Sequence, residues 1–423
     1  MAWLVIAILF ALILFDVPIG FALMITAGLS MWMGGIDLIT LPIQMFSGTN
    51  SVVLLAVPLF ILMGELMGAT SISERIIGLA SALVGWIRGG LSHVNIVTSM
   101  FMAEMSGSAV ADAAVMSKVF VPEMERKGYP RNFAATVTAT SATLGIIIPP
   151  SIPMVLYGVT TNTSIRDLFI AGIVPGILLG GAFMVTSYIF ARREGHPVDT
   201  SFEVVRLGRA LWRAAIPLLI PVIVVGGLIL GIVTPTEAAG IGVATALLFG
   251  LVLSRDLSMA KLYALLVTTA RQTSVVMMII AGSAVLGQYL ANEQIPQQIA
   301  EGLGGISDSS VVRLLLINVF LLLLGMFLHA SAAIIVVVPM LIPLAREIGL
   351  DPVHFGVIVC LNLGIGQQTP PVASVLLTVC SVTGLKIEQV MAYGKWFILS
   401  MFVVLLIVSF TPATALWFRF LSP

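Results

Sequence analysis

Residues 145–153 read Gly-Ile-Ile-Ile-Pro-Pro-Ser-Ile-Pro, a diproline in the middle of a long apolar segment. Two consecutive prolines remove two backbone N–H donors and clash with the preceding turn, so the carbonyls before them lose their helical partners. Within a bilayer, such carbonyls are tolerated only inside protein or beside a watery cavity. The stretch therefore predicts a broken helix at a functional position rather than an ordinary membrane span.

The same pattern occurs a second time in the chain. Pro149-Pro150 recurs as Pro370-Pro371, at an offset of 370 − 149 = 221 positions, and the same offset carries Gly145 onto Gly366. We therefore divide the chain into two halves, of about residues 1–200 and 205–423, joined by a polar stretch at 192–213. A repeat whose hydrophobic segments are interrupted by Gly and Pro at corresponding positions is typical of secondary transporters and locates their binding site.

The composition agrees with a membrane protein. Of the 423 residues, 59% are hydrophobic and only 9% are charged, whereas soluble domains carry roughly a quarter charged residues. A water-soluble enzyme of this size is therefore excluded, and equal numbers of basic and acidic residues give no indication of a nucleic-acid partner. Cys360 and Cys380 lie in apolar segments without metal-ligand spacing. Because no ATP-binding motif is found, any pumping must draw on an ion gradient.

The distribution of basic residues predicts the orientation of the two halves. In the first half, Lys and Arg are concentrated in a few loops and in the central linker, which the positive-inside rule places in the cytoplasm. The charged residues of segment 73–89 include Arg75 and Arg88, whereas the charged residues of its counterpart at 293–308 are all acidic. This change of sign predicts an inverted second copy, hence an odd number of crossings per half. Both termini then lie on the non-cytoplasmic side, and the first apolar run is a retained helix.

These observations predict an all-α membrane protein with two inverted repeats of five crossings each. The expected membrane helices are 3–14, 18–35, 50–70, 133–160, 165–192, 212–231, 236–254, 265–290, 353–381 and 394–419. Segments 73–89 and 293–306 are expected as interfacial arms, and 91–127 and 311–348 as re-entrant hairpins. The expected scaffold comprises 1–90 and 205–306, and the expected transport domain comprises 91–204 and 307–423.

Four interruptions at membrane depth are the candidate site: 105–109, 145–153, 325–331 and 364–371. Free carbonyls and nearby hydroxyls suit a small hard cation, and the freed helix N-termini attract an anionic group. The sequence thus predicts two oxygen cages beside a place for a carboxylate. Passive kinking by proline and close packing at small residues stay open as structural alternatives.

Several polar side chains near these interruptions are candidates for contact with substrate or cation. Gln367 and Gln368 replace the isoleucines of the first copy, which suggests substrate readout. Acidic residues inside the membrane are functional candidates by default. His329 is either a proton carrier or a satisfied buried histidine. The remaining candidates are Ser106, Ser108, Asp112, Glu65 and Glu104.

Four motifs connect the chain with a known family. They are residues 103–114 (Ala-Glu-Met-Ser-Gly-Ser-Ala-Val-Ala-Asp-Ala-Ala), 148–158 (Ile-Pro-Pro-Ser-Ile-Pro-Met-Val-Leu-Tyr-Gly), 234–240 (Thr-Pro-Thr-Glu-Ala-Ala-Gly) and 368–373 (Gln-Thr-Pro-Pro-Val-Ala). With them, essentially the whole chain resembles the large membrane subunit of tripartite ATP-independent periplasmic (TRAP) transporters. The resemblance implies a sodium-coupled importer of organic acids in the bacterial inner membrane, with an elevator mechanism and a fold of the ion-transporter superfamily. It also implies two partners, a small four-helix membrane subunit and a periplasmic substrate-binding protein.

The resemblance also implies roles for particular residues. One sodium ion would be held by Ser106, Gly145, Ile148 and Pro150, and a second by Gly325, Gly366, Thr369 and Val372, mostly through backbone oxygens. The expected substrate-binding residues are Ser108, Asp112, Pro153, His329, Ser331, Gln367 and Gln368. Family members take sialic acid, C4-dicarboxylates, keto acids and other carboxylates, and nothing in the sequence selects among them.

Two other functions stay open from the sequence. One is a self-sufficient sodium–carboxylate symporter of the same superfamily, which needs no binding protein. The other is a membrane-embedded enzyme or assembly factor, for which Asp112, Glu104 and His93 would form a polar centre. The second hypothesis predicts a cluster with displaced pKa values and no oxygen cages.

Overall fold

The computed structural model describes residues 2–15, 17–106, 109–295, 297, 298, 302, 307 and 309–420. Helices account for every regular element in this part of the chain, apart from one isolated bridge between Arg88 and Val198. Nine of the described helices are long and apolar enough to cross a membrane. The prediction of an all-α, multi-pass membrane fold is confirmed.

In the first half, the helices α1 to α4 are followed by an arm, a hairpin, a broken helix and a long closing helix. Their bounds are α1 (Ala2–Leu14), α2 (Ile19–Met33), α3 (Thr40–Thr49), η1 (Val52–Leu55), α4 (Ala56–Ala69), α5 (Ile72–Val84), α6 (Gly90–Ser106), α7 (Ala109–Arg126), α8 (Arg131–Ala142), α9 (Leu144–Ile147), α10 (Ile152–Thr161) and α11 (Ile165–Glu194). The hairpin is α6 and α7, and the broken helix is α8, α9 and α10.

The second half repeats this order. Its elements are α12 (Val204–Ile229), α13 (Pro235–Leu248), the π-helical turn η2 (Phe249–Leu253), α14 (Met259–Asn292), α16 (Ser310–Phe327), α17 (Ala330–Glu347), α18 (Pro352–Gly366), α19 (Ser374–Thr383), α20 (Ile387–Phe410), α21 (Ala413–Leu416) and η3 (Trp417–Phe420). Here α16 and α17 form the hairpin, and α18 and α19 form the broken helix.

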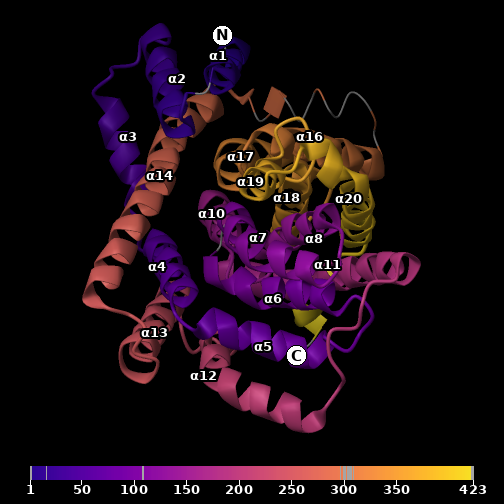
Figure 1. The fold of residues 1–423 in the computed structure, drawn as a ribbon. Helices are drawn as coiled ribbons and strands as arrows, with labels where there is room; N and C mark the ends of the chain where they lie inside the picture. Colours follow the sequence, from indigo (N-terminus) through magenta and orange to yellow (C-terminus); the bar gives the residue numbers. More distant parts are fainter. Residues whose placement is uncertain are drawn as a thin grey trace.

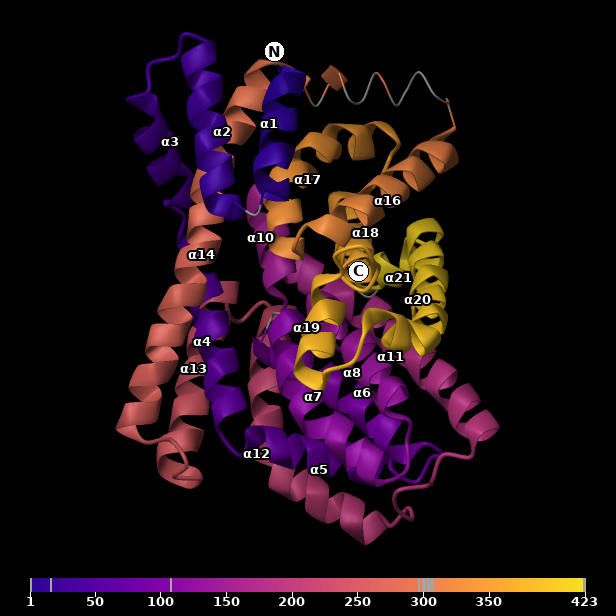
Figure 2. The same ribbon diagram turned by 45° about the horizontal axis from the view of Figure 1, so that its top comes forward.

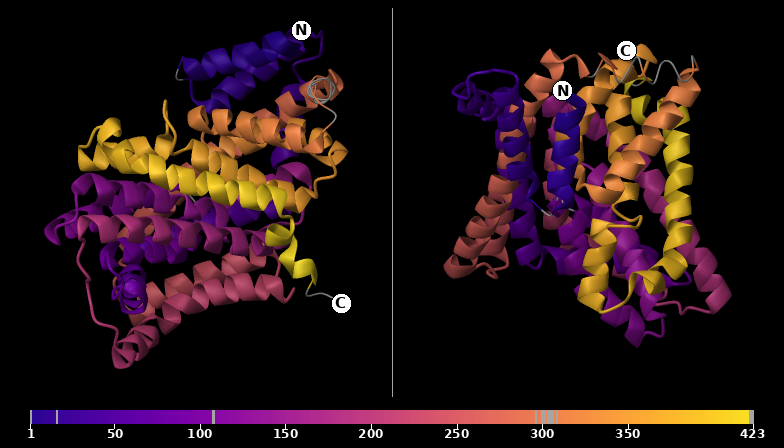
Figure 3. Two further views of the ribbon diagram at one scale, coloured as in Figure 1. Left: turned by 90° about the vertical axis from the view of Figure 1, so that its right-hand side faces the viewer. Right: turned by 90° about the horizontal axis from the view of Figure 1, so that it is seen from above.

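The helices fall into a wall and a body. Helices α2, α3, α4, α13 and α14 stand along one side of the molecule, and both hairpins and both broken helices gather beside them (Figures 1 and 2). Most of the long helices run side by side (Figure 3). Helices α5 and α12 pack on each other across one end of the molecule. This arrangement brings the interruptions at 145–153, 325–331 and 364–371 into the body, together with the described helix ends on either side of the first hairpin tip.

The body is built around the first broken helix. In the span Arg131–Thr161, 94% of the most apolar window is buried, against 28% for α12. Phe133, Phe183 and Phe397 are fully buried, and the Phe397 ring contacts Phe133 edge to face and Phe183 at a tilt. Lipid-facing helices bury one stripe of side chains, so full burial marks this segment as the centre of the protein.

The structure corrects several predicted boundaries. Helix α12 begins at Val204 rather than at residue 212, α14 at Met259 rather than 265, and α20 at Ile387 rather than 394. In each case the added turns carry charged or polar residues that extend past the hydrocarbon layer, where hydropathy gives no signal. Helix α3, a separate ten-residue helix, was not predicted. The second arm, 293–306, falls largely outside the described residues, as does the first hairpin tip at 107 and 108.

Candidate functional site

The two broken helices contact each other at the centre of the body. A Cβ atom at Gly364 of α18 would lie 3.7 Å from Ile146 and 3.8 Å from Thr143. The amide nitrogen Nε2 of Gln368 donates a hydrogen bond to the carbonyl oxygen of Ala139 at 2.6 Å. The second interruption therefore contacts both the first interruption and the helix α8 that precedes it.

The first interruption lies between α9 and α10. Ile148 leaves the helix with an extended backbone (φ −75°, ψ 127°). The Ser151 hydroxyl donates to the Ile146 carbonyl at 2.6 Å and accepts from the Met154 amide at 3.5 Å, so one side chain joins both ends of the break. Ser151 therefore acts as the N-cap of α10.

Helix α11 supports this break with a row of glycines. A Cβ at Gly172 would come within 2.3 Å of the Ile147 carbonyl oxygen, and one at Gly176 within 2.5 Å of the Ile148 side chain. Only a residue without a Cβ allows the helix to approach so closely. The position of the unwound segment is thus fixed by backbone contact.

The second interruption is joined directly to the tip of the second hairpin. A Cβ at Gly366 would lie 2.4 Å from the carbonyl carbon and 2.5 Å from the Cα of Gly325, so the two backbones touch. The Ala373 amide donates to the Met326 carbonyl at 3.3 Å. The hairpin tip therefore contacts the break at its beginning and at its end.

The residues expected to hold the second sodium ion are brought together in part. Gly325 and Gly366 are in contact, and Thr369, which donates to the Ile365 carbonyl at 2.9 Å, follows directly. Val372 lies in the same break and is 38% exposed. The oxygen-rich character of this break, with backbone carbonyls and a hydroxyl on a broken helix, suits an alkali ion.

Other residues near the breaks carry buried polar atoms without a hydrogen-bond partner in the described part of the chain. Both amide atoms of Gln367 and the Oδ1 atom of Asn362 are buried and have no hydrogen-bond partner among the described residues. Near the first break, the same holds for the Ser141 hydroxyl. Buried polar groups are almost always paired, so these atoms are candidates for contact with a ligand, although atoms without a described partner, such as the Thr26 and Thr269 hydroxyls, also occur away from the breaks.

The residues expected to hold the first sodium ion are placed less completely. Gly145 lies in α9, with Ile148 and Pro150 in the adjoining break. Ser106 ends α6, which packs against α9, but its side chain falls outside the described residues. Ser108 falls outside them altogether.

The remaining substrate candidates lie at helix starts around the breaks. Pro153 is buried in the first turn of α10. His329 is the N-cap residue of α17, and Ser331 is buried in its first turn. Asp112 is buried in the first turn of α7 and takes part in a polar interaction. Gln368 is already bonded to Ala139, so its amide holds the two broken helices together.

Neither of the acidic candidates Glu65 and Glu104 can be assigned to the breaks. Glu65 on α4 accepts a hydrogen bond from Gln272 on α14 at 2.8 Å, so it joins two helices outside the hairpins and broken helices. The Glu104 side chain lies outside the described residues. His93 sits at the start of α6, bonded to the Arg88 carbonyl at 3.2 Å. It is separated from Asp112, near the hairpin tip, by roughly 15 Å of helix, so these two do not form a common polar centre.

A buried amide network was missed by the sequence reasoning. Asn362 of α18 donates to Asn318 of α16 at 2.8 Å, and Asn318 donates to Ser409 of α20 at 3.2 Å. In the first half, Asn95 of α6 donates to Thr138 of α8 at 2.7 Å. Asn95 and Asn318 are related by an offset of 318 − 95 = 223 positions. An intramembrane asparagine at matching places in both repeats was the signal that could have found this network.

The comparison with known families decides the identity of the fold. The model of the tripartite ATP-independent periplasmic transporter DctM component matches residues 6–414. The chain belongs to the DctM family. The resemblance inferred from the four motifs is therefore confirmed over nearly the full length.

Individual relatives agree with this assignment. The sialic acid TRAP transporter large permease protein SiaM of Vibrio cholerae is 40% identical, covering 87% of this chain and 86% of SiaM. The C4-dicarboxylate TRAP transporter large permease protein DctM of Pseudomonas aeruginosa is 37% identical, covering 89% of this chain and 88% of that protein. Among solved structures, the YdaH transporter of Alcanivorax borkumensis matches in fold, with a TM-score of 0.64, 15% identity, and coverage of 91% and 88%.

Proposed function

We propose that this DctM-family protein is the large permease of a sodium-coupled importer of a small carboxylate in the bacterial inner membrane. The observation that carries the proposal is the contact of Gly325 at the second hairpin tip with Gly366 at the second break. A hairpin tip that touches an unwound helix can be ordered by a cation bound between them, which is the basis of coupling.

The coupling follows from the chemistry of the two breaks. Sodium ions, as co-transported cargo, would be held by the carbonyl oxygens of Gly145, Ile148, Gly325 and Gly366 and by the Thr369 hydroxyl. Helices α10 and α17 begin beside these breaks, and the positive end of each helix dipole favours a carboxylate. The substrate would therefore bind tightly only after sodium has fixed the hairpin tips.

An elevator movement is supported by the apolar contact between the proposed scaffold and transport domains. A cavity of about 830 Å³ separates α12 from α6, α11 and the first break, and its lining is almost wholly apolar. Among the described residues, one hydrogen bond joins α12 to α11, from Arg166 to the Ile229 carbonyl at 2.6 Å. The end of the arm α5 is attached more firmly, through backbone hydrogen bonds of Gly85 and Gly89 with residues 197–200. Because apolar contacts lack directional bonds, the body can slide along α12 at low cost.

The partners and the substrate class follow from the family. The name tripartite describes a transporter of several components, and we propose a small four-helix membrane subunit and a periplasmic binding protein as the other two. The two permeases compared above are named for sialic acid and C4-dicarboxylates, both carboxylates. We therefore propose an organic acid as the substrate of this chain.

Reconstitution in proteoliposomes tests the proposal. A thermal-shift screen of the partner binding protein first identifies the carboxylate. Uptake of that compound is then expected to require both an inward sodium gradient and the binding protein. Uptake that persists when potassium replaces sodium would refute the coupling. Uptake without the binding protein would instead indicate a self-sufficient symporter.

A further inference from the structure

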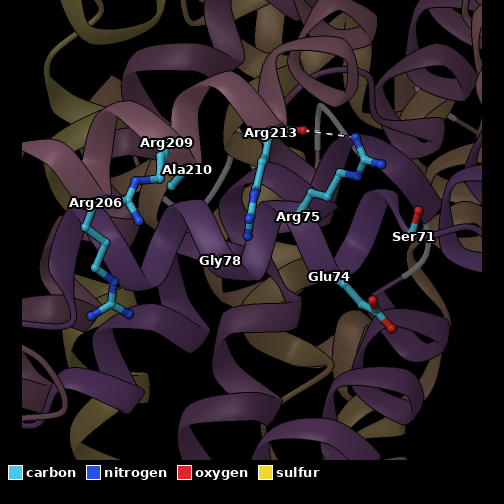
Figure 4. Close-up of a pocket in the computed structure, with 8 residues that line it drawn as sticks. All are labelled: Ser71, Glu74, Arg75, Gly78, Arg206, Arg209, Ala210 and Arg213. Carbon is cyan, nitrogen blue, oxygen red and sulfur yellow. Dashed lines mark hydrogen bonds between the residues drawn. The ribbon is translucent and has the colours of Figure 1, made fainter. Parts of the chain in front are cut away.

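A basic cavity of about 670 Å³ lies between α5 and α12, away from the two breaks. Figure 4 shows the side chains that line it. They are Ser71, Glu74, Arg75, Gly78, Arg206, Arg209, Ala210 and Arg213. Four arginines thus face one cavity that the proposed transport cycle does not use.

The cavity is lined by one face of α12 and one face of α5. Arg206, Arg209 and Arg213 are spaced three and four residues apart, so they share one face of α12, and that face packs on α5. Glu74 is the only carboxylate in the lining, and it points away from the arginines of α12 (Figure 4). None of the four arginines forms an ion pair with any residue that the structure describes.

Two of the arginines are braced and two are free to bind. Arg206 donates to the Ser81 hydroxyl at 3.0 Å, and Arg75 donates to the Arg213 carbonyl at 3.3 Å while stacking over Phe249. The guanidinium groups of Arg209 and Arg213 have no hydrogen-bond partner in the described part of the chain. Planar guanidinium groups bind phosphate through paired hydrogen bonds.

The cavity lies at the level of lipid headgroups. Helix α12 has 26 residues, or about 39 Å of helix, which exceeds the roughly 30 Å of hydrocarbon in a bilayer. Its arginine-bearing first turns therefore extend beyond the hydrocarbon. Beside them, Trp212 is 83% exposed, and Trp86 contacts Phe202 edge to face at 5.9 Å. Exposed tryptophans of this kind mark the membrane interface.

We infer that this cavity binds the phosphate headgroup of an anionic phospholipid. The four guanidinium groups supply the charge complement, and the exposed Trp86 and Trp212 place the cavity at the membrane interface. At this level the abundant phosphate is that of lipid headgroups, so the position of the cavity favours a lipid. The bound lipid would hold the arm α5 against α12 at the membrane surface.

Native mass spectrometry of the full chain in a nonionic detergent tests the inference. Phosphatidylglycerol and phosphatidylcholine are added in equal amounts, and the bound lipids are counted. Wild type is expected to retain phosphatidylglycerol preferentially. In the variant R209Q/R213Q, the ratio of bound phosphatidylglycerol to bound phosphatidylcholine is expected to fall by about tenfold or more, because each arginine near an anionic headgroup strengthens binding by about fivefold.

Two matched comparisons separate this site from general electrostatics. R192Q/R193Q removes two exposed arginines from the end of α11 and is expected to keep the preference. A Cβ at Gly78 meets nothing within 4 Å, so G78D places a carboxylate in the cavity without a clash; it should lower the preference, whereas G78A should not.

The outcomes that overturn the inference are equally specific. Retained preference in both R209Q/R213Q and G78D, or equal loss in R192Q/R193Q, would show that the cavity is not the site. Thermal shifts with millimolar inorganic phosphate identify the source of the ligand. Saturable stabilisation of wild type by inorganic phosphate, matching that by phosphatidylglycerol and lost in R209Q/R213Q, would overturn the assignment to a lipid.

Discussion

The backbones of Gly325 and Gly366 touch in the candidate site. A Cβ atom at Gly366 would lie 2.4 Å from the Gly325 carbonyl carbon, so this position excludes even a methyl group, whereas a Cβ atom at Gly325 would lie 3.1 Å from the nearest atom, the Cα of Leu363. Two residues before Gly366, a Cβ atom at Gly364 would make only ordinary van der Waals contacts, at 3.7 Å with Ile146 and 3.8 Å with Thr143, so a methyl group fits there. These two glycines of one helix therefore differ in function: Gly366 permits the contact between hairpin and break, and Gly364 takes no part in it.

We expect Gly366→Ala to reduce sodium-dependent uptake by about tenfold or more. The added methyl group would displace the hairpin tip, and overpacking of this kind costs about 1–3 kcal/mol. Gly364→Ala is the matched control on the same helix and is expected to keep uptake within about twofold. Proteoliposome uptake measures both, with thermal unfolding as a check on folding. Equal uptake by the two variants would contradict the role given to the hairpin contact.

At the residue scale, the sequence predicted which residues lie at the breaks better than it predicted their hydrogen-bond partners. Gly145 and Gly366 followed from the offset between the repeats, because backbone requirements leave a mark in one sequence. The role of Gln368 did not follow, since its bonding partner, Ala139, lies 229 positions away in the chain. Substrate readout by Gln367, whose amide is buried and unpartnered among described residues, stays a prediction.

Among the elements, the arm helix α5 is anchored at its start by a loop of the other half. Asp256 accepts a hydrogen bond from the Ser71 amide at 2.7 Å and another from the Ser254 hydroxyl at 2.5 Å. Burial opposes ionisation, but these hydrogen bonds outweigh it and lower the pKa of Asp256 below its ordinary value. A carboxylate at a helix start also interacts favourably with the helix dipole.

We expect Asp256→Ala to destabilise the protein by about 1–2 kcal/mol, because it removes this cap. The lowered pKa has a definite sign: the stabilisation is complete above the ordinary carboxyl pKa near 4 and is lost as the pH falls through the lower folded value. Thermal unfolding at neutral pH measures the effect. Asp37→Ala removes a carboxylate bonded only to the nearby Ile39 amide at 3.0 Å and should cost less than about 0.5 kcal/mol. Equal losses would argue against the anchor.

At the element scale, hydropathy predicted the existence of the spans but not their ends. Residues 204–211 were assigned to the polar linker because they carry Arg206 and Arg209. In the structure these arginines lie on one face of α12 and line the cavity against α5. Charge at helical spacing was the available signal, and its meaning depends on a partner helix that the sequence does not identify.

Across the whole molecule, the two repeats are interlocked. In each half, the first helix of the hairpin packs on the first segment of the broken helix in its own half: α6 on α8, and α16 on α18. The second helix of the hairpin packs on the last segment of the broken helix in the other half: α7 on α19, and α17 on α10. We expect a body joined crosswise in this way to move as one unit in the proposed transport cycle, and the sequence repeat did not predict this exchange.

A cross-link between the proposed scaffold and transport domains tests whether the body moves. Arg166 of α11 donates to the Ile229 carbonyl of α12 at 2.6 Å, so cysteines at both positions suit a cleavable bismaleimide. If the body slides along α12, joining Arg166→Cys to Ile229→Cys is expected to stop uptake, and reductive cleavage of the linker to restore it. The two native cysteines are buried and can stay in place.

The control pair of cysteine positions lies within the proposed scaffold. Thr236 donates to the Val52 carbonyl at 3.4 Å, which repeats the same side-chain-to-backbone geometry between two parts that move together in an elevator. Linking Thr236→Cys to Val52→Cys should therefore leave uptake unchanged, and each single-cysteine variant controls for modification alone. Full uptake after complete cross-linking of the α11–α12 pair would exclude sliding at this boundary. Transport would then have to arise from movement of the hairpin tips within a fixed body.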